Sequence, residues 1–138
     1  MLAVRCFGHF WSKDLVNWGT PGKGGAGRLL GYQVRNRKPF VVDFGDQIGI
    51  YVLFSASREA VYIGQTGSGE QRLIVRLRQH SQGAIRDRWT NFSWFGFRSV
   101  NQSARLSEHQ QPDSRCGGSH VDALDEIESV LSSCLSPA

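Results

Sequence analysis

The sequence contains no long apolar run and only three cysteines. None of its hydrophobic stretches approaches the roughly 20 residues that a membrane-spanning helix needs, which argues against a helical membrane protein. Cys6, Cys116 and Cys134 are an odd number at wide spacing, a pattern that does not form a disulfide framework and fits a reducing compartment. The chain has no Cys-x-x-Cys pair, which argues against structural zinc, although His109 and His120 flank Cys116.

Two further patterns are missing. The segment from Met1 to Cys6 lacks the basic-then-apolar layout of a secretory signal, so we expect a cytoplasmic protein, with signal-less export as an effector as the alternative. The glycine-rich stretch 19–27 contains Lys23 but lacks the Gly-x-x-x-x-Gly-Lys-Ser/Thr spacing of a phosphate-binding P-loop. We therefore expect a flexible basic surface loop there.

The composition is that of an ordinary globular domain. The chain has 138 residues, of which 40% are hydrophobic and 20% are charged, and this excludes global disorder. Its formal net charge is +4, and thirteen of its sixteen basic residues are arginine. Arginine is well suited to bidentate phosphate contacts, so the charge points mildly toward nucleic acid.

The middle of the chain predicts a β-hairpin. Residues 47–54 and 59–64 are rich in β-branched and aromatic side chains, and residues 55–58 form a plausible turn between them. Antiparallel pairing around that turn places Phe54 opposite Glu59 and Tyr51 opposite Tyr62. Directly opposed residues share one face of a sheet, so we expect the two phenols to lie side by side.

A helix is predicted to follow over residues 71–82. Its apolar face is formed by Leu73, Ile74 and Leu77. The adjoining flank carries Arg72, Arg76 and His80 at intervals of four residues. Residues 85–89 are helical or irregular, residues 91–100 are predicted as a third strand, residues 101–120 as a loop, and residues 121–135 as a final helix.

One carboxylate in the final predicted helix lies on its apolar side. The apolar stripe of this helix consists of Val121, Leu124, Ile127, Leu131 and Leu135. Glu126 points away from the stripe, whereas Glu128 falls inside it. An ionised carboxylate in that position is costly unless it is paired or bound to a metal. The helix alone leaves two explanations open, namely pairing with a buried arginine or binding of a metal ion.

Two short motifs connect these features. Gly49-Ile50-Tyr51 and Tyr62-Ile63-Gly64 are separated by eleven residues from tyrosine to tyrosine, and Arg76 and His80 follow on the predicted helix. This arrangement resembles the GIY-YIG nuclease family, which includes homing endonucleases, some restriction enzymes and an incision domain of nucleotide-excision repair. The resemblance implies an α/β (α+β) fold over residues 46–138, with a small three-stranded antiparallel sheet flanked by helices. Residues 1–45 would be an N-terminal extension of unassigned role.

The resemblance also implies a role for each site residue. Tyr51 would activate the attacking water, Arg76 would clamp the scissile phosphate, and Tyr62 and His80 would position the reactants or move protons. Glu128 would bind one Mg²⁺ or Mn²⁺ ion, and Gly49 and Gly64 are the glycines of the two motifs. Arg72 competes with Arg76 for the helix-arginine position, but only Arg76 has a histidine four residues later.

Further basic residues are expected to contact the DNA backbone. These are Arg72, Arg78, Arg86 and Arg88. Trp89 and Trp94 either stack on bases or belong to the core.

The implied function is divalent-metal-dependent hydrolysis of DNA phosphodiester bonds, with DNA as partner and no membrane. One alternative is a DNA-binding module of the same fold with impaired catalysis, because the Asn that many family members carry after the glutamate helix has no counterpart before Ala138. Another is an antibacterial toxin or effector nuclease. Every catalytic position is occupied, which favours the active nuclease. The sequence does not indicate an oligomeric state.

Overall fold

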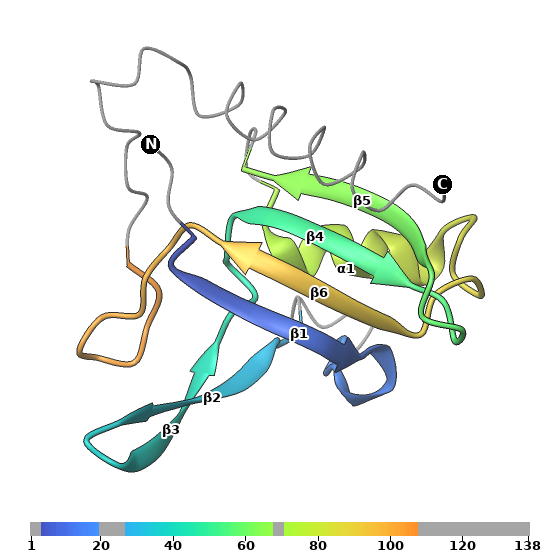
Figure 1. Cartoon of the computed structure of the whole chain (residues 1–138). Helices are drawn as coiled ribbons and strands as arrows, with labels where there is room; N and C mark the ends of the chain where they lie inside the picture. The colour runs from blue at the N-terminus through green and yellow to red at the C-terminus, as the bar shows by residue number, and fades with distance from the viewer. Residues whose placement is uncertain (1–3, 20–26, 68–70, 108–138) are drawn as a thin grey trace.

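The computed structural model describes residues 4–19, 27–67 and 71–107, which form a mostly β structure (Figure 1). These residues contain one α-helix, a short 3-10 turn at Lys13–Leu15 and six strands. The strands are β1 (Cys6–Ser12), β2 (Leu30–Arg35), β3 (Lys38–Asp43), β4 (Gly49–Phe54), β5 (Ala60–Thr66) and β6 (Asn91–Gly96), and the helix is α1 (Leu73–Gln82).

The predicted three-stranded sheet flanked by helices is wrong. The described strands form a four-stranded antiparallel sheet in the order β1-β6-β4-β5 and a separate two-stranded sheet, β2-β3. A single α-helix accompanies them within the described residues. The predicted final helix over 121–135 lies outside the described residues.

The additional edge strand comes from the N-terminal segment. β1 pairs antiparallel with β6, and its register shifts between Gly8 and Trp11. This irregularity breaks the period-two alternation by which a half-buried strand is recognised in a sequence. The aromatic residues of the segment therefore gave no clear strand pattern, although Trp11 packs against the core.

The predicted β4–β5 hairpin is present, but its register differs from the expected one. Tyr51 lies opposite Gly64, and Tyr62 lies opposite Leu53. Phe54 pairs with Ala60 instead of Glu59, and the register shifts by one further residue between Leu53 and Phe54. The direct opposition of Tyr51 and Tyr62 is therefore wrong. The displacement amounts to two residues, which returns each side chain to its expected face, whereas a displacement of one would have reversed it.

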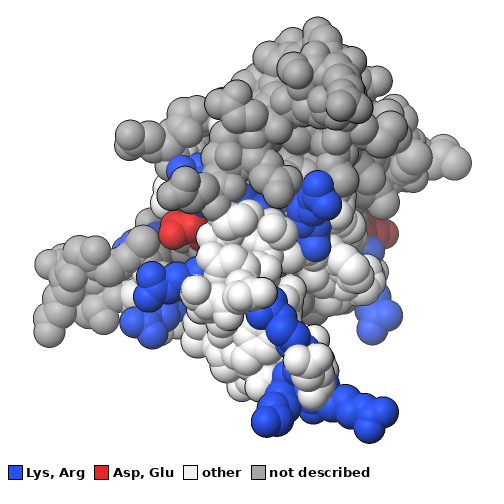
Figure 2. Space-filling model, turned by 90° about the vertical axis from the view of Figure 1, so that its left-hand side faces the viewer, with Lys and Arg blue, Asp and Glu red and all other residues white. Residues whose placement is uncertain are grey.

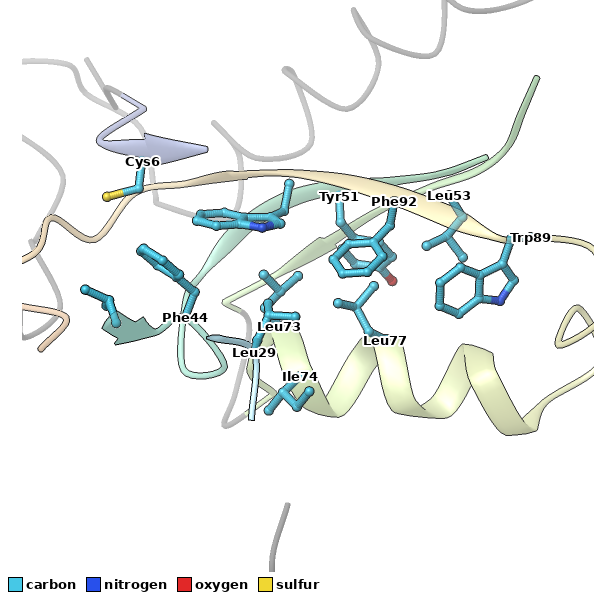
Figure 3. Packing of buried hydrophobic residues seen from close by; sticks show 12 residues of the cluster. Cys6, Leu29, Phe44, Tyr51, Leu53, Leu73, Ile74, Leu77, Trp89 and Phe92 are labelled. Atoms are coloured by element: carbon cyan, nitrogen blue, oxygen red, sulfur yellow. The ribbon is translucent and has the colours of Figure 1, made fainter. Parts of the chain in front are cut away.

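The core lies between one face of the sheet and α1 (Figure 3). Leu53 and Phe92 project from β4 and β6 toward Leu77, and all three side chains are fully buried. Leu73 and Ile74 complete the buried face of the helix, as its apolar pattern predicted. No helix within the described ranges is long and apolar enough to cross a membrane.

The first turn of α1 is held by a loop rather than by its own cap. Arg72, at the N-cap position, makes no side-chain capping bond. The N–H groups of Leu73 and Ile74 instead donate to the carbonyl oxygens of Gln47 (3.0 Å) and Gly45 (2.9 Å). These contacts satisfy two of the donors that every helix start leaves without an intrahelical partner.

The side chain of Gln47 joins the same loop to β6. Its amide donates to the carbonyl of Arg98 at 3.0 Å, and its Oε1 accepts the N–H of Arg98 at 2.8 Å. Gln47 is 1% exposed, so these bonds form away from water. Gly96 leaves the space for this side chain, because a Cβ there would lie 2.1 Å from Cδ of Gln47.

We expect Gln47→Leu to lower the free energy of unfolding by about 2 to 4 kcal/mol, because it removes both hydrogen bonds from the buried Gln47 side chain to the peptide groups of Arg98. Urea unfolding measures this change. Gln82→Leu, the same change at an exposed residue at the end of α1, is the control and should alter stability by less than about 0.5 kcal/mol. Equal effects of the two substitutions would contradict this account.

Candidate active site

Four of the five catalytic residues predicted from the sequence come from neighbouring elements. Tyr51 belongs to β4, Tyr62 to β5, and Arg76 and His80 to α1. The two tyrosines share the sheet face that α1 covers, because their register differs by an even number of residues. Arg76 and His80 lie one turn apart on the helix, so both are carried on the same side of it.

The aromatic side chains of this group are in direct contact. Tyr51 Oη lies 2.8 Å from Nε2 of His80, a hydrogen bond. The rings of Tyr62 and His80 have centroids 4.4 Å apart, and the two tyrosine rings stack at 6.1 Å with an interplanar angle of 24°. The predicted meeting of two phenols and the helix histidine is therefore present.

Both glycines of the two motifs are required by close packing. A Cβ on Gly64 would lie 2.4 Å from Cζ and Oη of Tyr51, so the tyrosine ring can lie over its cross-strand partner only because that partner is glycine. Gly49 has a φ of +150°, and a Cβ there would lie 1.9 Å from the carbonyl oxygen of Phe95. Gly49 thus allows β4 to pack closely against β6, and Gly64 leaves the space for the Tyr51 ring.

Burial keeps the Tyr51–His80 pair neutral at pH 7. Tyr51 is fully buried, and this burial raises the pKa of its phenol well above the usual range, although the charge of Arg76 opposes the rise. Burial also lowers the pKa of His80, and the Arg76 charge lowers it further. The family resemblance implied that Tyr51 would activate the attacking water, but at this residue desolvation outweighs the opposing effect of the Arg76 charge on the pKa.

The hydrogen bond with Tyr51 occupies the Nε2 atom of the His80 ring. When Nε2 carries the proton it donates to Tyr51 Oη, and Nδ1 is then the unprotonated nitrogen. Nδ1 of His80 has no hydrogen-bond partner among the described residues. His80 is half-buried, whereas Tyr51 is fully buried. His80 is thus the more accessible proton acceptor of the pair.

Arg76 supplies a cation beside this pair. One of its terminal nitrogens donates to Oε1 of Gln79 at 3.0 Å, while its buried Nε has no partner among the described residues. Its charge acts on both Tyr51 and His80, which places the guanidinium close to them. Gln79 was not predicted from the sequence, although its spacing of three residues from Arg76 on one helix was a usable signal.

The other predicted DNA-contacting arginines lie at the start of α1, within α1 and in the turns that follow it. Arg72 is half-buried at the helix start, and Arg78 is half-buried on α1. Arg86 and Arg88 are exposed in the turns that follow the helix, where Arg86 lies 3.5 Å from Asp87. Trp89 and Trp94 are both 1% exposed, so these two tryptophans belong to the core and do not provide stacking surfaces.

The described residues do not form a metal site by themselves. No three His, Cys, Asp or Glu side chains gather around a common point within the described ranges, and no described carboxylate pairs with Arg76. A neutral phenol and an imidazole are a poor ligand set for Mg²⁺, which prefers carboxylate oxygens and water. Glu128, the metal ligand predicted from the sequence, lies outside the described residues.

Comparisons with protein-family models, with curated proteins and with solved structures find no match to this chain.

The lowered pKa of His80 predicts a loss of stability in acid. The unfolded chain protonates His80 below about pH 6.5, while the folded chain binds that proton only at lower pH. The unfolded state therefore binds more protons in this window, and the free energy of unfolding falls as the pH drops through it. Urea unfolding between pH 4.5 and 7.5 should show a steeper acid loss for the parent than for His80→Gln. Parallel curves would contradict the assignment.

Proposed function

We propose that this protein is a metal-dependent endonuclease that hydrolyses DNA phosphodiester bonds, in the manner of the GIY-YIG family that its sequence resembles. The observation that supports the proposal is the convergence of Tyr51, Tyr62 and His80 beside Arg76. A structural role explains one half-buried tyrosine on a strand. It does not readily explain two phenols, an imidazole held neutral by burial and a buried guanidinium nitrogen without a partner, all gathered at one place.

In this proposal His80 removes the proton from the attacking water. Tyr51 holds Nε2 of the ring, which leaves the lone pair of Nδ1 as the acceptor. The water oxygen forms the new bond to phosphorus, its proton passes to Nδ1, and the bond from phosphorus to the leaving oxygen breaks. A histidine that is neutral at pH 7 is in the correct protonation state for this step. Tyr51 acts as the positioning residue and not as the base.

Arg76 stabilises the charge that builds up on the phosphate. Its guanidinium is always protonated, and its planar fork matches phosphate oxygens. Gln79 holds one of its terminal nitrogens, which restricts the orientation of the group. Tyr62 packs directly on the His80 ring and carries a half-buried phenol that can hydrogen-bond a phosphate oxygen or the water.

The metal requirement in this proposal rests on Glu128. A single carboxylate with bound water molecules suits Mg²⁺ or Mn²⁺, and such an ion would neutralise phosphate charge when bound. The position of Glu128 on the apolar stripe of its predicted helix supports this role. The proton transfer assigned to His80 involves only residues of the described site.

We expect the protein to nick supercoiled plasmid in the presence of Mg²⁺ and to be inactive in EDTA. His80→Ala should slow nicking by about 10² to 10⁴-fold, because it removes the general base. The parent rate should fall as the pH drops through the pKa of His80, which lies below its ordinary value. Nicking in agarose gels, followed over time at several pH values, measures both effects.

His9→Ala is the matched control, because His9 is an exposed histidine on β1 whose side chain hydrogen-bonds Ser93 and belongs to no part of the candidate active site. It should nick at the parent rate. A protein that binds DNA but does not nick it under any of these conditions would instead be a binding module with impaired catalysis.

Two glutamates of one predicted helix test the metal assignment. Glu128→Gln should abolish cleavage and remove the thermal shift caused by Mg²⁺, while DNA binding stays nearly intact because arginines make the phosphate contacts. Glu126→Gln should cleave at the parent rate and change stability by less than about 0.5 kcal/mol. Nicking and thermal-shift assays compare the two variants, and the opposite ranking would refute the assignment of Glu128.

A further inference from the structure

The β2–β3 hairpin is a separate two-stranded ribbon that points away from the four-stranded sheet (Figure 1). Its six-residue strands pair in continuous register from Leu30–Asp43 to Arg35–Lys38. Each strand spans roughly 20 Å. We call residues 30–43 the arm. The candidate active site uses none of them.

The inner face of the arm is anchored to the body. Val42 is 1% exposed, and Gly31 lies against the rings of Trp11 and Phe44. Gln33 donates to Sγ of Cys6 at 3.7 Å. At the base, one carboxylate oxygen of Asp43 accepts the N–H groups of Leu29 (3.0 Å) and Gly45 (2.9 Å). These contacts fix the direction of the arm.

The outer face of the arm is exposed and largely apolar. Tyr32 and Val34 are 79% and 71% exposed, and Leu30 and Val41 are about half exposed on the same face. A two-stranded ribbon needs only one packed face to stay folded on a body. The exposed apolar face is therefore a surface that the described part of the chain leaves uncovered.

The turn at the tip of the arm carries positively charged residues, and one of them, Arg37, has a backbone conformation that non-glycine residues rarely adopt. Asn36 and Arg37 have φ of 54° and 62°, as the two-residue type I′ turn between β2 and β3 requires. Glycine fits the second position of this turn best, yet the sequence has arginine there. Arg37 and Lys38 are exposed and make no side-chain interaction with the described residues. Arg58, another exposed arginine with positive φ, lies over the ring of Phe10.

Arg35 completes the positive charge of the tip. Its guanidinium lies over the Phe40 ring and donates to the carbonyl of Asn101 at 3.3 Å. Figure 2 shows lysine and arginine side chains gathered at the lower end of the molecule, where the arm lies, with no Asp or Glu among them. Within the arm the only acidic residue is Asp43, at the far end from the tip.

We propose that the arm is a duplex-DNA-binding element that lies in the major groove, with Arg37 and Lys38 on the flanking phosphates. The proposal rests on DNA being the substrate of the candidate active site. A two-stranded ribbon fits the width of the major groove, and ribbons are used to bind DNA in this way. The exposed face of Tyr32, Val34 and Val41 then meets sugars and base edges, while the cations neutralise phosphates.

Charge favours duplex DNA over a second copy of this chain as the occupant. A second copy offers the apolar face an apolar partner but brings its own basic tip. DNA presents a phosphate for each of the unpaired cations. No contact within the described residues explains why arginine occupies a position with an unfavourable φ. A contact between Arg37 and a DNA phosphate would explain it.

The test measures binding to a labelled duplex of about 30 base pairs, without divalent metal, across a range of salt concentrations. Arg37→Gly should weaken binding roughly 5- to 10-fold at 0.1 M salt and lower the salt slope by about 0.9, the loss of one phosphate contact. Adding Lys38→Gln should lower the slope by about 0.9 again. The melting temperature of Arg37→Gly should equal or exceed that of the parent, since glycine suits the turn.

Arg58→Gly is the matched control, because it removes the same charge at the same φ on another hairpin. It should bind duplex DNA like the parent. If the parent binds DNA and the Arg37 and Arg58 variants behave alike, the arm proposal fails and the nuclease proposal stands. If the parent neither binds nor cuts DNA, both fail. A dimer in sedimentation that Tyr32→Ser converts to monomer also overturns the arm proposal, because the apolar face is then covered by a second copy.

Discussion

The arrangement of the described residues depends on the hydrogen bonds of Gln47. Its side chain holds Arg98, just beyond β6, and its carbonyl oxygen receives the first N–H of α1. One residue therefore links the start of β4, the end of β6 and the start of the helix. Because α1 has no side-chain cap of its own, these bonds set where the helix begins on the sheet. They thereby set which helix residues lie over β4 and β5.

The chemistry of the candidate site follows from that placement. The helix lies close enough to the sheet for His80 to bond Tyr51, and Gly64 leaves the space that the Tyr51 ring occupies. The same close packing removes water from both groups, so the phenol keeps its proton and the imidazole stays uncharged at pH 7. A looser helix would leave both side chains solvated, with ordinary pKa values and without the hydrogen bond that orients the His80 ring.

The shared sheet face of Tyr51 and Tyr62 was predicted from the sequence, whereas the fold was not, for physical reasons. Side-chain faces depend on period two in a strand and 3.6 in a helix, so the shared face of Tyr51 and Tyr62 was accessible from local patterns. The meeting of these tyrosines with His80 was implied only by the family resemblance. The register was missed because Phe54 pairs with Ala60 instead of Glu59, and the irregularity between Leu53 and Phe54 adds a second residue of displacement. The fourth strand was missed because its irregularity after Gly8 breaks the alternation.

The arm was missed because its turn lacks the usual signal. Asn-Gly between alternating apolar residues announces a type I′ hairpin, but this turn has Asn36-Arg37, and Pro39 follows within the second strand. Arginine at position 37 makes this turn less stable than glycine would at the same position. Such departures tend to mark functional positions, and this one places a free cation at the end of a rigid ribbon.

The arm and the candidate site are held by one short segment, residues 43–47. Asp43 fixes the base of the arm through the N–H groups of Leu29 and Gly45, and Gly45 and Gln47 together receive the first N–H groups of α1. The direction of the arm and the start of the helix that carries His80 are therefore set by consecutive hydrogen bonds without a flexible linker between them. A ligand bound along the arm would therefore be held in one orientation relative to the helix that carries Arg76 and His80, and a fixed orientation is what a positioned attack on a single phosphate requires.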